Sequence, residues 1–134
     1  MTALDTNVLI YACDKADPRR QQIALDLIAR ATDAILLWQV AREFIAASRK
    51  LKEQGFTPAD AWDRLADFLR LFRLVSPSAT VLPRARDFHL RHSVSFWDAL
   101  IVAACLESGV QTLYSEDIPG QEAFGSVKIV NPLS

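Results

Sequence analysis

Hydrophobic and polar residues alternate along the chain with two periods, one typical of short buried strands and one typical of amphipathic helices. Short apolar segments predict strands at Thr2–Asp5, Ala34–Trp38, Arg73–Ser76, Thr112–Tyr114 and Lys128–Val130. Helical spacing predicts helices over Val8–Cys13, Pro18 to about Thr32, Gln39 to about Gln54, a segment that starts at Thr57-Pro58, about Thr80 to His92, and Ser95–Glu107. Strands that alternate with helices indicate an α/β fold, with a central parallel sheet covered on both faces.

Signals at the boundaries of these elements place two acidic residues at strand ends. Thr6 and Asn7 are suited to cap the first helix, which would leave Asp5 free for another role. Gly55 is expected to close the helix that precedes it. Asp5 and Asp117 each follow a predicted strand, and ligands of parallel α/β sheets gather beyond the carboxyl ends of the strands. The topology therefore points to a site that contains both acids.

Length and composition favour one folded unit. The chain has 134 residues, of which 51% are hydrophobic and 23% charged, so we expect a single domain over residues 1–134. The longest apolar run, Ala99 to Leu106, has eight residues, against the ~18 needed to suggest a membrane span. Asp5 interrupts any secretory signal, so a cytoplasmic protein is expected. Cys13 and Cys105 lie in apolar helical stretches and give little reason to expect a disulfide or a metal ligand.

Four acidic residues each interrupt or open an apolar element, namely Asp5, Glu43, Asp98 and Asp117. A carboxylate beside the core loses hydration and is retained only with a cation, hydrogen bonds or a proton. Four of them in one pocket, at ~6 Å separations, would repel by about 3 kcal/mol per pair at an effective dielectric near 20. Oxygen-only ligation points to Mg²⁺, with Mn²⁺ also suitable, rather than to zinc.

Each of these acids also has an ordinary structural explanation. Asp5 suits a turn or helix cap, and Glu43 lies at the boundary of an apolar helix stripe, where a rim residue is common. Asp98 fits the last position of a capping box. Asp117 is a loop acid before a turn signal, and Glu116 could serve in its place. The sequence spacing leaves these alternatives open.

The charge balance becomes more favourable to a nucleic-acid partner if the four acids bind metal. The formal net charge is −1 and the pI is near 6.1, which alone argues against such a partner. Without the four acids, 12 acidic residues face 15 basic ones. The basic residues form two groups along the chain, Arg42, Arg49, Lys50 and Lys52, and then Arg84, Arg86, His89, Arg91 and His92. Solvated helix faces remain the favoured explanation for either group.

Aromatic residues near the candidate site have two interpretations. Tyr11, Trp38, Phe96 and Trp97 could stack nucleic-acid bases, although core packing is favoured for most of them. His89 and His92 are spaced to bind metal, but without a third ligand of the same type a surface position is favoured.

Taken together, four segments resemble PIN-domain ribonucleases, and in particular the VapC-type toxins of bacterial toxin–antitoxin pairs. They are LDTNVLIYA, the helix glutamate after the second strand, SFWDALIVAA and YSED, in the same order and over the whole chain from Leu4. The resemblance implies a three-layer α/β/α sandwich around a parallel sheet. It assigns Asp5, Glu43, Asp98 and Asp117 to the catalytic metal site. It assigns Thr6, Asn7 and Ser115 to supporting polar positions.

The resemblance also implies an activity and partners. The expected activity is metal-dependent endoribonuclease cleavage of single-stranded RNA by metal-activated water, which leaves 5′-phosphate and 3′-hydroxyl ends. A homodimer and a cognate antitoxin protein are the expected partners. One alternative is a non-catalytic PIN-like module that binds RNA or protein. A second is a receiver-like domain, which needs an acidic pair after the first strand and a late lysine, whereas the only lysine in the last third is Lys128 within a predicted strand.

Overall fold

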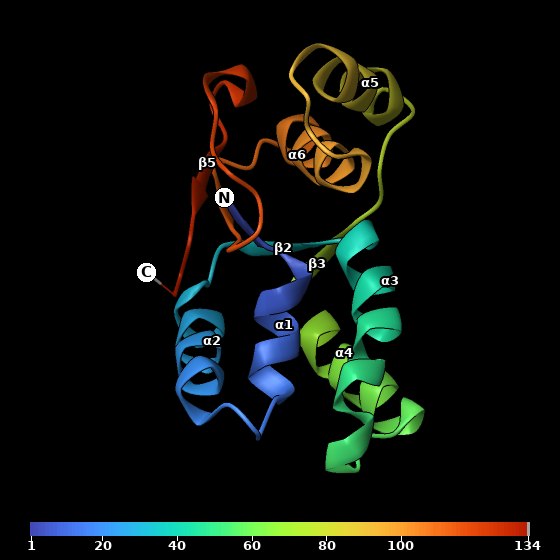
Figure 1. The fold of residues 1–134 in the computed structure, drawn as a ribbon, viewed down its shortest axis with the longest axis vertical. Coiled ribbons are helices and arrows are strands. Elements are labelled where there is room, and N and C mark those ends of the chain that lie inside the picture. The colour runs from blue at the N-terminus through green and yellow to red at the C-terminus, as the bar shows by residue number, and fades with distance from the viewer. Residues whose placement is uncertain (134) are drawn as a thin grey trace.

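The computed structural model describes residues 1–133 as a parallel sheet between two layers of helices (Figure 1). The strands are β1 (Thr2–Leu4), β2 (Ala34–Leu37), β3 (Arg73–Val75), β4 (Thr112–Tyr114) and β5 (Lys128–Val130). The α-helices are α1 (Thr6–Cys13), α2 (Pro18–Arg30), α3 (Trp38–Ala47), α4 (Pro58–Leu71), α5 (Val81–Arg91) and α6 (Phe96–Ser108). Two 3₁₀-helices, η1 (Ser48–Gln54) and η2 (Glu122–Phe124), complete the described elements. The predicted three-layer α/β/α architecture is confirmed.

The sheet has the strand order β3-β2-β1-β4-β5, and every pairing is parallel. β1 is the central strand, where Ala3 pairs with Ile35 of β2 and with Leu113 of β4. Figure 1 shows α1 to α4 on one face of the sheet and α5 and α6 on the other. Because both faces are covered, every residue of β2 is buried, as is typical of parallel sheets.

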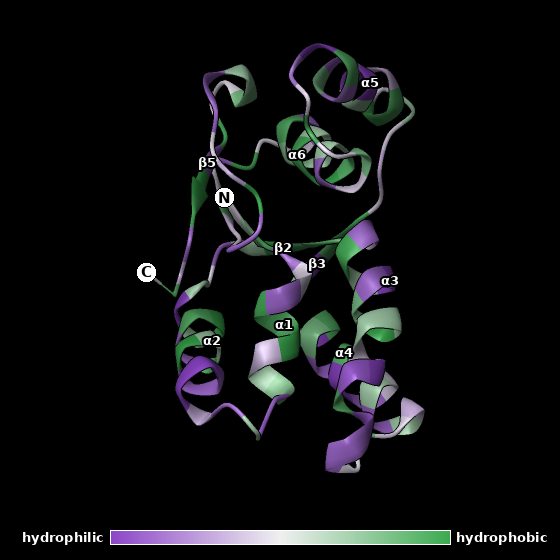
Figure 2. Ribbon diagram, in the orientation of Figure 1, coloured by the Kyte–Doolittle hydropathy of each residue, from purple (hydrophilic) through white to green (hydrophobic). Residues whose placement is uncertain are grey.

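The core extends through both helical layers. The rings of Phe44 in α3 and Phe68 in α4 meet edge to face with centroids 5.4 Å apart. On the other face, the rings of Phe88 in α5 and Phe124 in η2 meet in the same way at 5.3 Å. Figure 2 shows that α6 is hydrophobic over much of its length, and it lies between the sheet and α5. The sheet is therefore held from both sides, and the ends of its strands are fixed.

Two predicted boundaries differ from the structure around β2 and α3. Trp38, predicted as the last residue of a strand, is instead the first residue of α3. The helix predicted to run to about Gln54 ends at Ala47 and continues as η1. The Ser48 hydroxyl donates to the carbonyl of Ile45 at 2.7 Å, and such back-bonding competes with α-helical geometry. Gly55 closes the segment in the left-handed region with φ 79°, as predicted.

The prediction for the start of α1 is wrong. The helix begins at Thr6, and Asp5 is its N-cap, whereas Thr6 and Asn7 were expected to be the caps. Both side chains contact acidic residues of other segments instead. The remaining helix ends agree with the prediction within about two residues, a difference that is usual at frayed termini. Within residues 1–133, no helix has the length and apolar character required to cross a membrane.

Candidate active site

Asp5 lies at the carboxyl end of the central strand and is held by two hydrogen bonds. Its Oδ1 accepts the Thr6 backbone N–H at 2.8 Å, and its Oδ2 accepts the Ser115 hydroxyl at 2.7 Å. Asp5 is only 9% exposed. Burial raises the pKa of Asp5, the two hydrogen bonds oppose that rise, and the charges of Asp117 and Asp98 add to it. A nearby cation would therefore stabilise the ionised form of Asp5.

Ser115 connects Asp5 to the loop that follows β4. β1 and β4 pair in parallel with Leu4 opposite Tyr114. Asp5 and Ser115, the residues that follow these two, therefore lie side by side. The Ser115 hydroxyl donates to Asp5 and accepts the backbone N–H groups of Asp117 and Ile118, each at 3.2 Å. This residue is 2% exposed. One buried hydroxyl thus fixes both Asp5 and the backbone that carries Asp117.

Thr6 connects Glu43 to the same end of α1. Its hydroxyl donates to Oε2 of Glu43 at 2.9 Å, although the two residues come from different helices. Glu43 is half-buried, and this burial is the main reason why its pKa is raised. The Thr6 hydrogen bond lowers that pKa, the negative charge of Asp5 raises it, Arg42 lowers it and Asp98 raises it. Glu43 therefore belongs to the same electrostatic cluster as Asp5.

Asp98 lies in the first turn of α6. Its backbone N–H donates to the hydroxyl of Ser95, the N-cap, at 3.2 Å. Partial burial raises the pKa of Asp98, the Ser95 hydroxyl lowers it, and the charge of Asp117 raises it again. Capping and participation in the acidic cluster are thus compatible, because the cap contact uses the backbone of Asp98.

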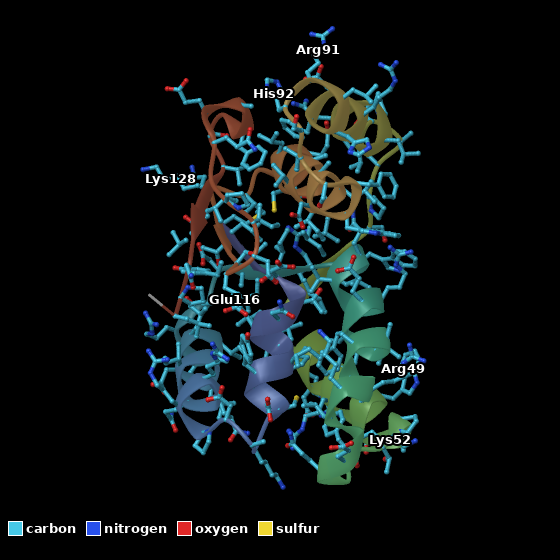
Figure 3. The ribbon with its side chains drawn as sticks, viewed as in Figure 1. Arg49, Lys52, Arg91, His92, Glu116 and Lys128 are labelled. Carbon is cyan, nitrogen blue, oxygen red and sulfur yellow. The ribbon has the colours of Figure 1, made fainter. Side chains whose placement is uncertain are left out.

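Asp117 and Glu116 are both contacted by α1. The Asn7 side-chain amide donates to Asp117, and one turn later the Tyr11 hydroxyl donates to Glu116. Burial and the Glu116 contact raise the pKa of Tyr11 to about 12, and the Arg20 guanidinium lies 5.3 Å from the ring centroid. Figure 3 shows Glu116 beside α1. The Tyr11 contact was not predicted, although two polar residues four apart on one helix face can match two consecutive acids.

The four acids form one electrostatic cluster with the donor chemistry of a hard divalent cation. Burial and mutual repulsion raise the pKa of Asp5, Glu43 and Asp98. A bound cation would therefore stabilise the ionised form of these carboxylates. All donor atoms are oxygens, which suits Mg²⁺ or Mn²⁺. Among residues 1–133, no three His, Cys, Asp or Glu side chains are yet arranged to hold a metal ion. The donor set fits the cation chemically, and binding would require the side chains to converge.

Exposed aromatic side chains border this cluster, and here the preference for core packing is wrong. Trp38 is 44%, Phe96 45% and Trp97 57% exposed, whereas Tyr11 is half-buried. The Phe96 and Trp97 rings meet edge to face at 5.0 Å, and the Arg42 guanidinium lies 5.5 Å from the centroid of the Trp38 ring. Aromatic surface is therefore available to a ligand beside the acids.

The histidines and basic residues lie on the surface. His89 and His92 are exposed, as expected, and His89 Nδ1 is hydrogen-bonded to the Val94 carbonyl oxygen. Figure 3 shows Arg91 and His92 at one end of the molecule and Arg49 and Lys52 towards the other. The two basic groups of the sequence are thus separate surfaces. Within the second group, Arg84 pairs with Glu107 at 2.8 Å and Arg91 with Asp87 at 3.0 Å.

Comparison with known proteins identifies relatives of this architecture. A family model described as the PIN domain matches residues 2–118. No curated protein sequence matches the chain. VapC20 of Mycobacterium tuberculosis, described as a sarcin-ricin loop cleaving toxin, superposes with a TM-score of 0.70 and 21% identity, covering 87% of this chain and 90% of its own.

Two toxin–antitoxin assemblies superpose over nearly the whole chain. VapBC2 of Rickettsia felis, bound to a DNA fragment from its promoter, has a TM-score of 0.68 and 17% identity, with 97% of this chain and 98% of that chain covered. A toxin–antitoxin complex from Klebsiella pneumoniae has a TM-score of 0.66 and 18% identity, with 98% of each chain covered. At these identities the likeness establishes the fold.

Proposed function

We infer that this chain, which belongs to the PIN-domain family, is a metal-dependent endoribonuclease that cleaves single-stranded RNA and acts as the toxin of a toxin–antitoxin pair. The observation that carries this proposal is the acidic cluster around the start of α1. Three of its carboxyl groups have raised pKa values because of burial and mutual repulsion. The ionised acids repel one another unless a cation is bound. Such a cluster can hold the divalent cation that metal-dependent phosphodiester hydrolysis uses.

The four carboxylates share one proposed role as metal ligands. Asp5, Glu43, Asp98 and Asp117 would hold Mg²⁺, with Mn²⁺ as a substitute, through oxygen ligands. A bound divalent ion lowers the pKa of water and neutralises charge on the scissile phosphate. Asp5 is held most firmly, because both of its oxygens accept hydrogen bonds. We propose water as the nucleophile, so that 5′-phosphate and 3′-hydroxyl ends result.

Three polar side chains would orient the ligands. Ser115 fixes Asp5, Thr6 fixes Glu43, and Asn7 fixes Asp117 through the hydrogen bonds described above. Partners of this kind orient metal ligands, and their loss typically costs 10–100-fold in metal affinity or activity. Each of the three therefore supports one acid and is a positioning residue in the proposed reaction.

The proposed partners follow from the structural relatives. Two of the structural relatives are toxin–antitoxin assemblies, and the one from Rickettsia felis is also bound to a DNA fragment. We propose that this chain binds a cognate antitoxin protein that covers the acidic cluster, that it forms a homodimer, and that it works in the cytoplasm, where its RNA substrate is found. A purified complex with the antitoxin should be inactive until the antitoxin is removed.

A second candidate function is a non-catalytic PIN-like module that binds RNA or a protein. The observation in its favour is that, within residues 1–133, no three candidate ligands are already arranged around an ion position. Such a module would hold RNA equally well with and without a divalent cation. The metal dependence of cleavage thus separates the two candidates.

The testing experiment incubates end-labelled single-stranded RNA with purified protein in Mg²⁺, Mn²⁺ or EDTA, alongside Asp98→Asn. The nuclease function predicts cleavage by the wild type in either metal, none in EDTA, and none by a variant whose circular dichroism is unchanged. If folded wild-type protein free of antitoxin cuts no single-stranded RNA in any metal, the result would favour the non-catalytic binding module.

A further inference from the structure

We propose that a surface recess between α3 and α6 is a stacking site for a nucleobase of the RNA strand, next to the scissile phosphate. This aromatic recess is lined by Arg42, Glu43 and Ala46 of α3 and by Trp97 of α6. Its volume is about 380 Å³. The proposal rests on the proposed nuclease function, because it names the part of the substrate that this surface binds.

The aromatic recess is continuous with the acidic cluster. Glu43 belongs to both, since its carboxylate accepts the Thr6 hydroxyl while its side chain lines the recess. Trp97 immediately precedes Asp98 in the first turn of α6. Figure 1 shows α3 and α6 on opposite faces of the sheet, so the recess lies where the two helical layers meet. A strand whose phosphate reaches the acids would therefore pass this surface.

Trp97 is exposed in the first turn of a helix whose later turns contribute to the core. Its residue is 57% exposed, whereas Ala99 is 0% and Ile101 3% exposed in the following turn. Phe96 packs edge to face against the indole at 5.0 Å and so restricts its orientation. A large indole left in solvent but held by a neighbouring ring is ready to receive a flat partner without a large ordering cost.

The charges around the recess match a single-stranded nucleic acid. Without a bound cation the acidic cluster repels a phosphate but not a neutral base, so a base can lie beside Glu43 whether or not the cation is present. Arg42 supplies a cation on the same wall, and its guanidinium lies over the ring of Trp38 at 5.5 Å. Guanidinium groups both stack on planar rings and pair with phosphate oxygens. Stacking accepts every base, because each base has a π-face.

The test measures binding and cleavage of a short single-stranded RNA by Trp97→Ala, Trp97→Phe and Trp62→Ala. Trp62 is the matched control, because it is also an exposed tryptophan, 60% exposed, but it lies on α4 outside the recess. Binding is followed by fluorescence anisotropy of labelled RNA in EDTA, in an Asp98→Asn background that prevents cleavage. Cleavage is followed in Mg²⁺ with Asp98 intact, and oligomeric mass by analytical ultracentrifugation.

We expect Trp97→Ala to weaken RNA binding by about tenfold or more and to raise KM more than it lowers kcat. Trp97→Phe should retain most of the affinity, because a ring remains, and Trp62→Ala should match the wild type. Arg42→Gln should weaken binding and reduce the salt dependence by about one phosphate contact. If Trp97→Ala does not fold, Trp97→Phe and Arg42→Gln must show these partial effects for the proposal to stand.

Two outcomes would overturn the stacking site while leaving the nuclease function intact. The first is wild-type affinity and KM in folded Trp97→Ala, whatever the effect of Arg42→Gln. The second is a change in oligomeric mass in Trp97→Ala, which would assign the recess to an interface between copies of the chain. Failure of the wild type to cut any RNA is distinguishable, because it removes the nuclease function while the anisotropy measurement still reports on the recess.

Discussion

The inner and outer parts of the acidic site are built differently. The inner part comprises Asp5, Thr6 and Ser115, which are 9%, 7% and 2% exposed, together with the half-buried Glu43 that Thr6 contacts. The outer part comprises the exposed Asp117 and three half-buried residues. These are Asp98 at the start of α6, Glu116, and Tyr11, which contacts Glu116. The Ser115 hydroxyl bonds to Asp5 at 2.7 Å and the Thr6 hydroxyl bonds to Glu43 at 2.9 Å, in both cases across elements. The inner part is thus a polar section of the core, and the outer part is a surface ready to receive a ligand.

This difference separates two kinds of sensitivity. Changes in the inner part should affect both stability and activity, because its groups would be left buried without partners. Changes in the outer part should affect activity with little loss of stability, because water can solvate what remains. Predictions that compare the two parts can therefore confirm or refute the division.

The largest expected effect is the loss of cleavage when an acid in either part is neutralised. Asp5→Asn and Asp117→Asn should each reduce single-turnover cleavage of single-stranded RNA by at least about 10²-fold, the scale for removing one charge-stabilising group. Asp63→Asn, on an exposed position of α4, is the control. Full activity of Asp117→Asn would exclude it from the site and direct attention to Glu116.

The next effect is on stability and belongs to the inner part. Ser115→Ala should lower the free energy of unfolding by about 1–3 kcal/mol, because one buried hydroxyl makes three hydrogen bonds. Urea denaturation measures this change, and Ser126→Ala, at an exposed position, is the control. A loss below about 0.5 kcal/mol would show that the inner part is not a stabilising section of the core.

A smaller effect concerns pH and metal. Burial raises the pKa of Glu43 above its ordinary value of 4.5 and that of Asp5 above 3.8. The folded state then holds more protons than the unfolded chain in the window above those values, so stability without metal falls as pH rises through it. We expect Glu43→Gln to reduce this fall and to raise Tm in EDTA at pH 7 by roughly 2–8 °C.

Divalent metal should reverse that loss in the wild type. Adding Mg²⁺ or Mn²⁺ at pH 7 should raise the Tm of the wild type and raise it less in Glu43→Gln, since a ligand of the folded state stabilises it. Thermal scans across pH 4 to 8 in EDTA and in metal measure both effects. Identical pH profiles for the two proteins would contradict the proposed strain among the acids.

The smallest expected effect lies in the outer part. Tyr11→Phe removes the hydroxyl that donates to Glu116, and we expect a loss of about 0.5–1.5 kcal/mol in unfolding free energy. With a pKa of about 12, the hydroxyl is protonated and able to donate at neutral pH. Tyr114→Phe, on β4, is the control for removing a hydroxyl from another half-buried ring. A loss as large as that of Ser115→Ala would remove the distinction between the parts.

Sequence patterns predicted the architecture because they report local period and turn chemistry. β4 and β5 were predicted with the observed bounds, and Gly109 ends α6 in the left-handed region with φ 77°, as its position indicates. The candidate acids were identified for the same reason, since a charge inside an apolar segment is a local anomaly. What the patterns could not give was the set of partners.

The errors arise where tertiary contacts decide the outcome. Thr6 was expected to cap α1, but Glu43 takes its hydroxyl, and Asp5 becomes the cap. Core packing was favoured for most of the four aromatic residues, yet Trp38 and Trp97 are exposed. Both stand in the first turn of a helix and are exposed there. The helical period indicates which side of a helix is apolar. It does not indicate whether a neighbouring element extends far enough to cover the first turn.

The pairing of β1 with β4 has a consequence for the order in which the molecule is made. Asp5 bonds to Ser115 and Asn7 to Asp117, and each pair is separated by 110 residues of chain. A growing chain therefore exposes its first acids long before their partners exist, and contacts this distant in sequence form late. A nascent chain that stops short of β4 lacks Ser115 and Asp117, so the acidic site is assembled only after this strand and the loop that follows it have been synthesised.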